Sequence, residues 1–189
     1  VFNGKVILGT RARKTRSKSF EAFSSINYPV LALVQDGRLI RYIRPEYREK
    51  PVFYDKVNPK VALMKLIPGA DCDMVRWLLE RNDALIIESF GVGGLPTYEE
   101  GSYYEAVKEG LSQGKMVVMT TQVENEGSDL SVYQVGTHVK RNLPILEAYD
   151  MTTEAVTAKL MWILGQTTDR EKAAELFYTP VACDILAQK

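Results

Sequence analysis

Five basic side chains gather within eight residues near the start of the chain, in Arg11-Ala-Arg-Lys-Thr-Arg-Ser-Lys18. Such a cluster suits a solvated loop, a nucleic-acid contact, or an active-site loop whose cations hold carboxylates. Nucleic-acid binding would require these charges on one face beside stacking aromatic rings, and the nearest aromatic residues are Phe20 and Phe23. The pattern therefore argues against nucleic acid and leaves the other two roles open.

A second segment with chemical potential is the glycine-rich Gly91-Val-Gly-Gly-Leu-Pro96, which leads from a predicted strand into a predicted helix. Free amides at the start of a helix can hold an anion such as a carboxylate. The segment lacks the third glycine of G-x-G-x-x-G, and no acidic residue ends a following strand to hold a ribose. We therefore expect no dinucleotide cofactor here, and a tight turn without a ligand is the alternative.

The cysteines and the single histidine do not predict a metal site. Cys72 and Cys183 have no C-x-x-C spacing, and only His138 could join them as a ligand. We expect both cysteines to be ordinary thiols in a reducing compartment, and His138 to have a surface or capping role rather than a catalytic one. No metal and no cofactor are expected.

Bulk properties favour a folded globular protein. The 189 residues are 46% hydrophobic, which is enough for one core or two small ones. No apolar run approaches the roughly 20 residues of a membrane span, and the start does not resemble a signal peptide. Residues 1–50 contain eleven Lys or Arg and four Asp or Glu, which gives a net charge of +7. The rest of the chain has a net charge of −7. This asymmetry suggests that the two parts face each other or face different partners.

The first part of the chain reads as short strands joined by tight turns. Asn3-Gly4 and Asp36-Gly37 are two-residue signals for β-hairpins, because both residues tolerate the positive φ angles of a type I′ turn. The second of these turns joins apolar strands predicted at 28–34 and 39–43. A polar segment containing three prolines then follows, and we place a linker at about 44–60.

From Val61 onward, strands alternate with helices, which predicts a parallel sheet of the Rossmann-like or flavodoxin-like kind. The first helix, at 73–81, has a predicted apolar stripe of Met74, Val75, Leu78 and Leu79. The second opens with a capping box at 97–100 and ends near Gly114. The remaining helices are predicted at about 150–165 and 169–178, and the buried strands at 61–67, 84–90 and 115–120. In such a sheet, ligands bind beyond the carboxyl ends of the strands.

The segment from Met119 to Gln166 resembles the C-terminal half of a bacterial cytoplasmic (type I) L-asparaginase. The resemblance rests on a buried strand, the polar loop 122–129, Val132-Tyr-Gln-Val-Gly136, and a helix opened by Asp150-Met-Thr-Thr-Glu154. The family's threonine nucleophile lies near the start of the full protein, and no part of this chain resembles that segment. We therefore expect the C-terminal portion of an enzyme. Residues 1–44 would end the catalytic domain, 45–60 would form the linker, and 61–189 would form the C-terminal α/β domain.

The resemblance also implies roles for particular residues. Lys14-Thr15, followed by Phe23 and Asn27-Tyr28, matches the basic loop that carries the family's catalytic lysine, so Lys14 would help to deprotonate a threonine hydroxyl. The family's loop corresponding to Gly91, Gly93 and Gly94 crosses a dimer interface and approaches the neighbouring active site. The family's usual asparagine at the end of that loop is replaced here by Gly94.

Some members of this family bind asparagine at a regulatory site, and its three marker positions have changed in this chain. They read Arg13, Glu88 and Val123 in place of threonine, arginine and cysteine. We expect Arg13 to pair with a glutamate where the effector would bind, and we expect this regulation to be absent. In the acidic loop, Glu126 is a candidate contact for the substrate's amine.

The implied reaction is hydrolysis of L-asparagine to L-aspartate and ammonia by the full-length protein, as a cytoplasmic homodimer or homotetramer. L-Glutamine is the alternative substrate. Two other functions stay open at this point. One is the glutamine-amidase subunit of a tRNA-dependent amidotransferase, which Lys159-Leu-Met-Trp-Ile-Leu-Gly165 also resembles. The other is a non-enzymatic binding or assembly module.

Overall fold

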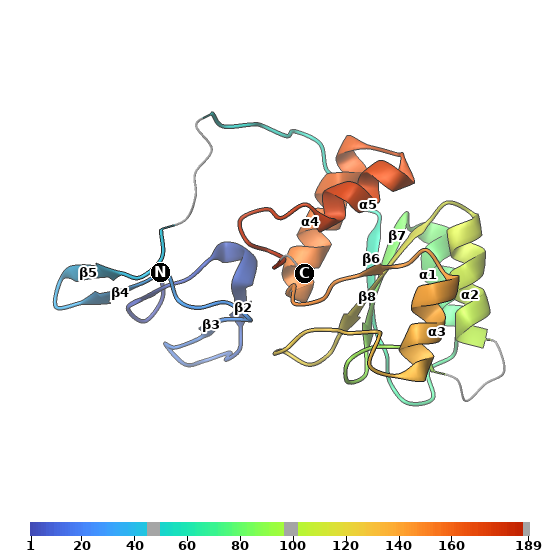
Figure 1. Ribbon diagram of the computed structural model, residues 1–189, viewed down its shortest axis with the longest axis horizontal. Coiled ribbons are helices and arrows are strands. Elements are labelled where there is room, and N and C mark those ends of the chain that lie inside the picture. The colour runs from blue at the N-terminus through green and yellow to red at the C-terminus, as the bar shows by residue number, and fades with distance from the viewer. Residues whose placement is uncertain (45–49, 97–101, 187–189) are drawn as a thin grey trace.

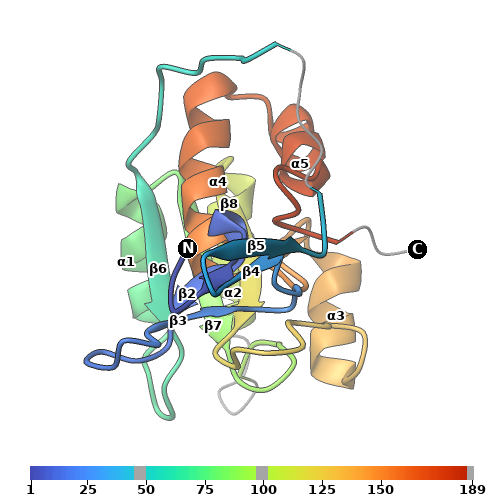
Figure 2. The ribbon, with the colours of Figure 1, turned by 90° about the vertical axis from the view of Figure 1, so that its left-hand side faces the viewer.

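The computed structural model describes residues 1–44, 50–96 and 102–186. It has two parts that differ in secondary structure (Figure 1). Residues 1–43, called the N-terminal module below, form small antiparallel sheets, whereas the other part is a parallel sheet covered by helices. Viewed from its own side, the module lies in front of α4 (Thr153–Gln166) and of the parallel sheet (Figure 2).

The N-terminal module contains two antiparallel sheets, one ordered β1-β4-β5 and one formed by β2 and β3. Asp36 and Gly37 have φ angles of 50° and 70°, so the predicted two-residue turn joins the last two strands of the first sheet. Asn3 and Gly4 form a similar turn that is closed by the bridge between Phe2 and Lys5. The elements are β1 (Lys5–Val6), the 3-10 turn η1 (Gly9–Arg11), β2 (Ala12–Lys14), β3 (Phe23–Ser25), β4 (Ala32–Gln35) and β5 (Arg38–Arg41).

The central sheet is parallel, and its strands follow one another across the sheet in chain order, β6-β7-β8-β9. Every residue of the two middle strands is buried, which explains their continuous runs of apolar residues. The fold is therefore the α/β class that the alternation of strands and helices predicts. The strands are β6 (Val61–Lys65), β7 (Ala84–Ser89), β8 (Met116–Thr121) and β9 (Leu146–Glu147).

Helices cover both faces of this sheet (Figure 1). Because right-handed crossovers that advance in one direction place their helices on one side, α1, α2 and α3 share a face. They pack there against Leu85 and Ile87, whereas α4 and α5 pack on the opposite face against Ile86 and Val118. The helices not yet delimited are α1 (Asp73–Arg81), α2 (Ser102–Ser112), α3 (Gln134–Asn142) and α5 (Arg170–Tyr178).

Most of the predicted elements are present, but the structure also differs from the prediction in several places. Val75 and Leu79 of the stripe on α1 are buried and Leu78 is partly buried, but Met74 is 53% exposed, so the apolar face is narrower than predicted. The sequence analysis also did not predict α3, the short β9, or the strands β2 and β3. The capping box at 97–100 lies outside the described residues. Across the described part of the chain, no helix combines the length and apolar character needed to cross a bilayer.

Candidate functional site

The N-terminal module is fixed to the α/β part by the fully buried side chain of Arg11. Its Nη2 pairs with Asp150 Oδ2 at 2.8 Å, and its Nη1 donates to the Asp150 carbonyl oxygen at 2.7 Å. Its Nε donates to the carbonyl oxygen of Cys183 at 2.6 Å. All three guanidinium nitrogens therefore bind the C-terminal part, and this explains how an arginine can be buried.

The aromatic residue at this junction is Tyr28, whose ring centroid lies 5.6 Å from Arg11 Cζ. Its hydroxyl donates to Cys183 Sγ at 3.6 Å, and this hydrogen bond, together with burial, raises the pKa of Tyr28. Cys183 and Cys72 both have free thiols.

Arg13 lies on β2 and faces two carboxylates of the α/β part. Its Nε is 3.7 Å from an oxygen of Glu124 and 3.7 Å from an oxygen of Glu154. Glu88, another of the changed marker positions, is not one of these partners, because it is buried in β7 and its carboxylate accepts a hydrogen bond from the Thr153 hydroxyl at 2.8 Å. Arg13 therefore pairs with glutamates, as expected, and the structure identifies them as Glu124 and Glu154.

Lys14 follows Arg13 at the end of the same strand and is exposed. Successive side chains of a strand point to opposite faces, so Lys14 and Arg13 leave β2 on opposite faces. Its ammonium group makes neither an ion pair nor a side-chain hydrogen bond with any residue that the structure describes. Next to it, the hydroxyls of Thr15 and Ser24 are 2.9 Å apart. The ammonium group of Lys14 therefore has no partner among the described residues, whereas the neighbouring Arg13 and Thr15 both make polar contacts.

The glycine-rich loop follows β7 and folds back over the end of the sheet. Gly93 and Gly94 have φ angles of 123° and 124°, which L-residues with side chains rarely adopt. A Cβ at Gly93 would lie 2.8 Å from Leu130 Cδ2. The hydroxyl of Ser89 donates to the Gly94 carbonyl oxygen, and that of Thr121 donates to the Gly91 carbonyl oxygen. The glycines thus let the loop lie close against the segment after β8.

The acidic loop, residues 122–129, follows β8 at the same edge of the sheet. Val123, a former effector position by resemblance, is 51% exposed, and its N–H donates to Thr121 Oγ1 at 3.0 Å. At the end of the loop, hydrogen bonds from the Ser131 hydroxyl and N–H hold the pKa of Asp129 below its usual value. The loop is therefore ordered by local polar contacts at both ends.

Glu126 lies near the middle of this loop with an exposed side chain and a φ angle of 75°. Its N–H donates to Asn27 Oδ1 of the N-terminal module at 2.8 Å. Its carboxylate makes no ion pair and no side-chain hydrogen bond among the described residues. The structure thus brings the module to the carboxyl edge of the sheet, while Lys14 and Glu126 each keep a charged group that no described residue pairs.

Residues 60–177 match the family described as Glutaminase/Asparaginase C-terminal domain, and residues 1–47 match the family described as Asparaginase, N-terminal. The chain belongs to the asparaginase/glutaminase family. The first of these matches alone covers more than half of the chain.

Relatives in this family have two different names. An L-asparaginase from Thermococcus kodakarensis is 37% identical over 187 residues, covering 97% of this chain and 56% of that protein. A glutamyl-tRNA(Gln) amidotransferase subunit from Pyrococcus furiosus is 31% identical over 183 residues, covering 94% of this chain and 40% of that protein. The chain therefore spans about half the length of the curated relatives that it matches.

Solved structures of asparaginases share the fold. The thermostable L-asparaginase from Thermococcus kodakarensis superposes with a TM-score of 0.92 at 34% identity, over 99% of this chain and 56% of that one. L-asparaginase I from Vibrio cholerae gives a TM-score of 0.81 at 26% identity, over 99% of this chain and 57% of that one. The similarity thus includes the N-terminal module as well as the α/β part.

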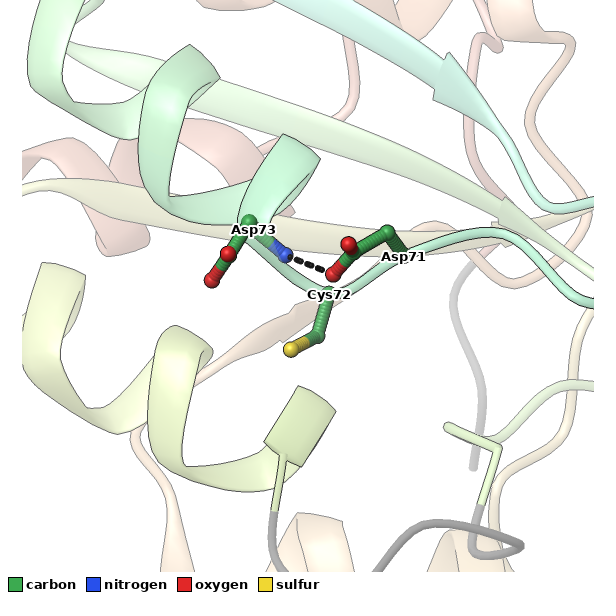
Figure 3. Close-up of side chains that lie close together, drawn as sticks. All are labelled: Asp71, Cys72 and Asp73. Carbon is green, nitrogen blue, oxygen red and sulfur yellow. Dashed lines mark hydrogen bonds between the residues drawn. The ribbon is translucent and has the colours of Figure 1, made fainter.

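Asp71, Cys72 and Asp73, before α1, are a group whose ligand atoms lie within 4.8 Å of one another (Figure 3). The contacts around this group are those of a helix start, since Asp71 Oδ1 accepts the N–H of Asp73 at 2.9 Å. Arg76 Nη1 lies 2.9 Å from Asp73 Oδ1 and 3.4 Å from Cys72 Sγ. The guanidinium group of Arg76 therefore already lies beside Cys72 and Asp73, and we assign no metal-binding role to the group.

Arg11 and Asn27 are the site residues whose importance sequence reasoning missed. Both lay within the segment that resembles asparaginases, but Arg11 was counted only as part of a basic cluster, and Asn27 only as part of the match. No local pattern marks them, because their partners at Asp150 are 139 and 123 positions away in the chain.

Proposed function

We propose that this chain forms the C-terminal portion of a longer protein, and that the longer protein hydrolyses L-asparagine to L-aspartate and ammonia. The observation that carries the proposal is the placement of Lys14 in a chain of this family. Lys14 is exposed at the end of β2 and unpaired among the described residues, while its neighbour Arg13 is tied to the α/β part. In this proposal Lys14 has the catalytic role, while Arg13 holds the strand against the α/β part.

In the proposed reaction, a threonine outside this chain attacks the carbonyl carbon of the substrate's side-chain amide. The C–N bond then breaks, the nitrogen leaves as ammonia after receiving a proton, and water hydrolyses the acyl-enzyme ester to aspartate. Lys14 would promote deprotonation of the threonine hydroxyl, either as a neutral amine that takes the proton or as a cation beside the developing alkoxide. The chemistry requires no metal and no cofactor.

The loops at the sheet edge would complete the site. Glu126 has a carboxylate that no described residue pairs, and it would bind the substrate's ammonium group. The loop containing Gly91, Gly93 and Gly94 would reach the active site of a neighbouring copy in a dimer or a tetramer. Glycine at position 94 removes the side-chain amide usual in the family, so this loop would contribute only backbone groups. We place the protein in the cytoplasm as a bacterial-type enzyme, divided into catalytic, linker and C-terminal regions at 1–44, 45–60 and 61–189.

The former effector positions support a protein without asparagine-dependent activation. Arg13 is bound by Glu124 and Glu154, Glu88 is bound by Thr153, and Val123 has no polar side-chain atom. We expect the rate of the complete enzyme to follow a hyperbolic dependence on L-asparagine. A sigmoidal dependence, measured by ammonia release, would contradict this part of the proposal.

The central test is Lys14→Met in the full-length protein. We expect turnover to fall by at least ~100-fold, because groups that transfer protons in the transition state typically contribute that much. Arg16→Met is the matched control, since Arg16 lies two residues away and is 53% exposed. Circular dichroism would establish that both variants fold. Turnover within ~3-fold of wild type in Lys14→Met would refute the role of Lys14.

A second test uses the 189 residues alone, which we expect to release no ammonia because no segment of them resembles the family's nucleophile segment. Detectable release that is not removed by further purification would overturn the assignment of the nucleophile to another segment.

The second candidate function is the glutamine-hydrolysing subunit of an amidotransferase, and the relatives named as glutamyl-tRNA(Gln) amidotransferase subunits favour it. Comparison of kcat/KM for L-asparagine and L-glutamine separates the two functions. A clear preference for L-glutamine, together with co-purification of a second protein, would replace the asparaginase proposal with this one.

A further inference from the structure

We propose that Asn27 is a positioning residue that fixes the acidic loop and thereby directs the carboxylate of Glu126. This inference rests on the proposed function, because it assigns Glu126 to the amine of an amino-acid amide. Asn27 itself would touch no substrate.

Asn27 joins two segments of the α/β part through its side-chain amide. Its Oδ1 accepts the N–H of Glu126 at 2.8 Å, and its Nδ2 donates to the carbonyl oxygen of Asp150 at 3.1 Å. The backbone of Asn27 has a φ angle of 53°, which asparagine tolerates better than most residues with a side chain. The side-chain amide therefore acts as both acceptor and donor. Aspartate would lack the donor and leucine would lack both, so neither could replace asparagine fully.

The acidic loop turns sharply where Asn27 holds it. Glu126 and Gly127 have consecutive positive φ angles of 75° and 82°. Gly127 lies directly on the backbone of Tyr149, where a Cβ would be only 2.2 Å from the carbonyl oxygen. The N–H of Ser128 donates to the same oxygen at 2.8 Å. One side of the turn is thus fixed by the α/β part, and Asn27 fixes the other.

The anchor point of Asn27 is itself rigid. The Asp150 carbonyl oxygen that it contacts also accepts a hydrogen bond from the buried Arg11, and the Asp150 carboxylate accepts the N–H of Leu186 at 3.1 Å. Arg13 adds a weaker tie to the loop through Glu124, at 3.7 Å. The loop is therefore attached to the same module that carries Lys14.

The consequence for Glu126 follows from this arrangement. Its backbone is held while its exposed carboxylate has no partner among the described residues. Holding the backbone limits where this carboxylate can lie, so less conformational freedom is lost when it binds an ammonium group. Asn27 should therefore affect substrate binding more than the chemical step.

The test compares Asn27→Gly with Asn3→Gly in the full-length protein. Both changes remove an asparagine from a positive-φ position without introducing strain, but Asn3 lies in the turn before β1, away from the loop. Asn27→Asp is a third variant, which keeps the acceptor for the Glu126 N–H and loses the donor to Asp150. Hydrogen exchange of residues 122–129 and the separate values of KM and kcat for L-asparagine are measured.

Asn27→Gly removes two hydrogen bonds, so we expect the exchange rate of the loop and the KM for L-asparagine each to rise by ~10-fold. We expect kcat to change by less than ~3-fold. Asn27→Asp should give smaller changes, and Asn3→Gly should leave both quantities at the wild-type value. Unchanged exchange in Asn27→Gly would overturn the inference, and so would faster exchange with an unchanged KM. Faster exchange in a full-length protein that hydrolyses neither asparagine nor glutamine would support the clamp and refute the proposed function.

Discussion

The strongest prediction concerns the loss of Arg11, for which Arg11→Met is the informative change. Methionine fills much of the same space with a flexible apolar chain, so the loss of the charge and of the donors dominates the effect. The variant removes an ion pair with Asp150 and hydrogen bonds to two carbonyl oxygens, those of Asp150 and Cys183.

The expected magnitude follows from the burial of the pair. Removing one partner of a buried ion pair costs about 3–5 kcal/mol, because the other charge is left uncompensated. The side chain of Asp150 is 15% exposed and keeps the N–H of Leu186, so we expect the lower end of that range, about 3 kcal/mol. Adding Asp150→Asn to Arg11→Met should recover about 1 kcal/mol or more, because no unpaired carboxylate then remains.

Urea unfolding of the full-length protein, followed by circular dichroism and tryptophan fluorescence, measures these differences. Arg16→Met is the matched control, since its ion pair with Glu21 is exposed and long at 3.8 Å, and should change the free energy of unfolding by less than about 1 kcal/mol. If Arg11→Met and Arg16→Met lowered the free energy of unfolding equally, the stability of the junction would not depend on Arg11, and the prediction would be refuted.

Two further predictions test the acidic loop and the end of the linker. Gly127→Ala should lower the melting temperature more than Gly69→Ala does, because both have φ above 70° but only Gly127 lies against backbone atoms; equal shifts in calorimetry would argue against this packing. The amide of Asn58 donates to Asp83 at 2.9 Å and holds the pKa of that carboxyl below its ordinary value. This contact thus adds stability above the unfolded-state pKa, which is lost as pH falls through the folded-state pKa. Asn58→Ala should raise the pKa of Asp83 in an NMR titration, and an unchanged pKa would show that the hydrogen bond is not its cause.

Much of the fold could be predicted because its signals are local. The Asp36-Gly37 turn and the bounds of α1 follow from residue types within a few positions of one another. α3 was missed because Val135, Gly136 and Thr137 all disfavour helix, and its formation depends on tertiary packing. A Cβ at Gly136 would lie 2.5 Å from the carbonyl oxygen of Leu130, so glycine is needed there for close packing rather than for a turn.

The candidate site was less predictable than the fold, because its residues are joined by long-range contacts. The family resemblance pointed to Lys14 and to the loops at the sheet edge, and the structure places Lys14 on an exposed strand end. The resemblance could not show which carboxylates Arg13 would face, since Glu124 and Glu154 lie far from it in the chain. Their approach to Arg13 follows from the docking of the module, in which Arg11 contacts Asp150 and Cys183.

The sequence separation between Arg11 and its partners affects the folding of the chain during synthesis. The contact of Arg11 at Cys183 is 172 positions away, so the ribosome needs roughly 10–35 s to supply the partner after Arg11 has been added. Throughout that interval the module cannot complete its docking, because the Nε of Arg11 has no carbonyl oxygen to bind. A nascent chain that stops short of Cys183 would therefore display a loosely held basic segment. Such incomplete chains would be targets for chaperones and proteases, because the junction that holds the module is not yet complete.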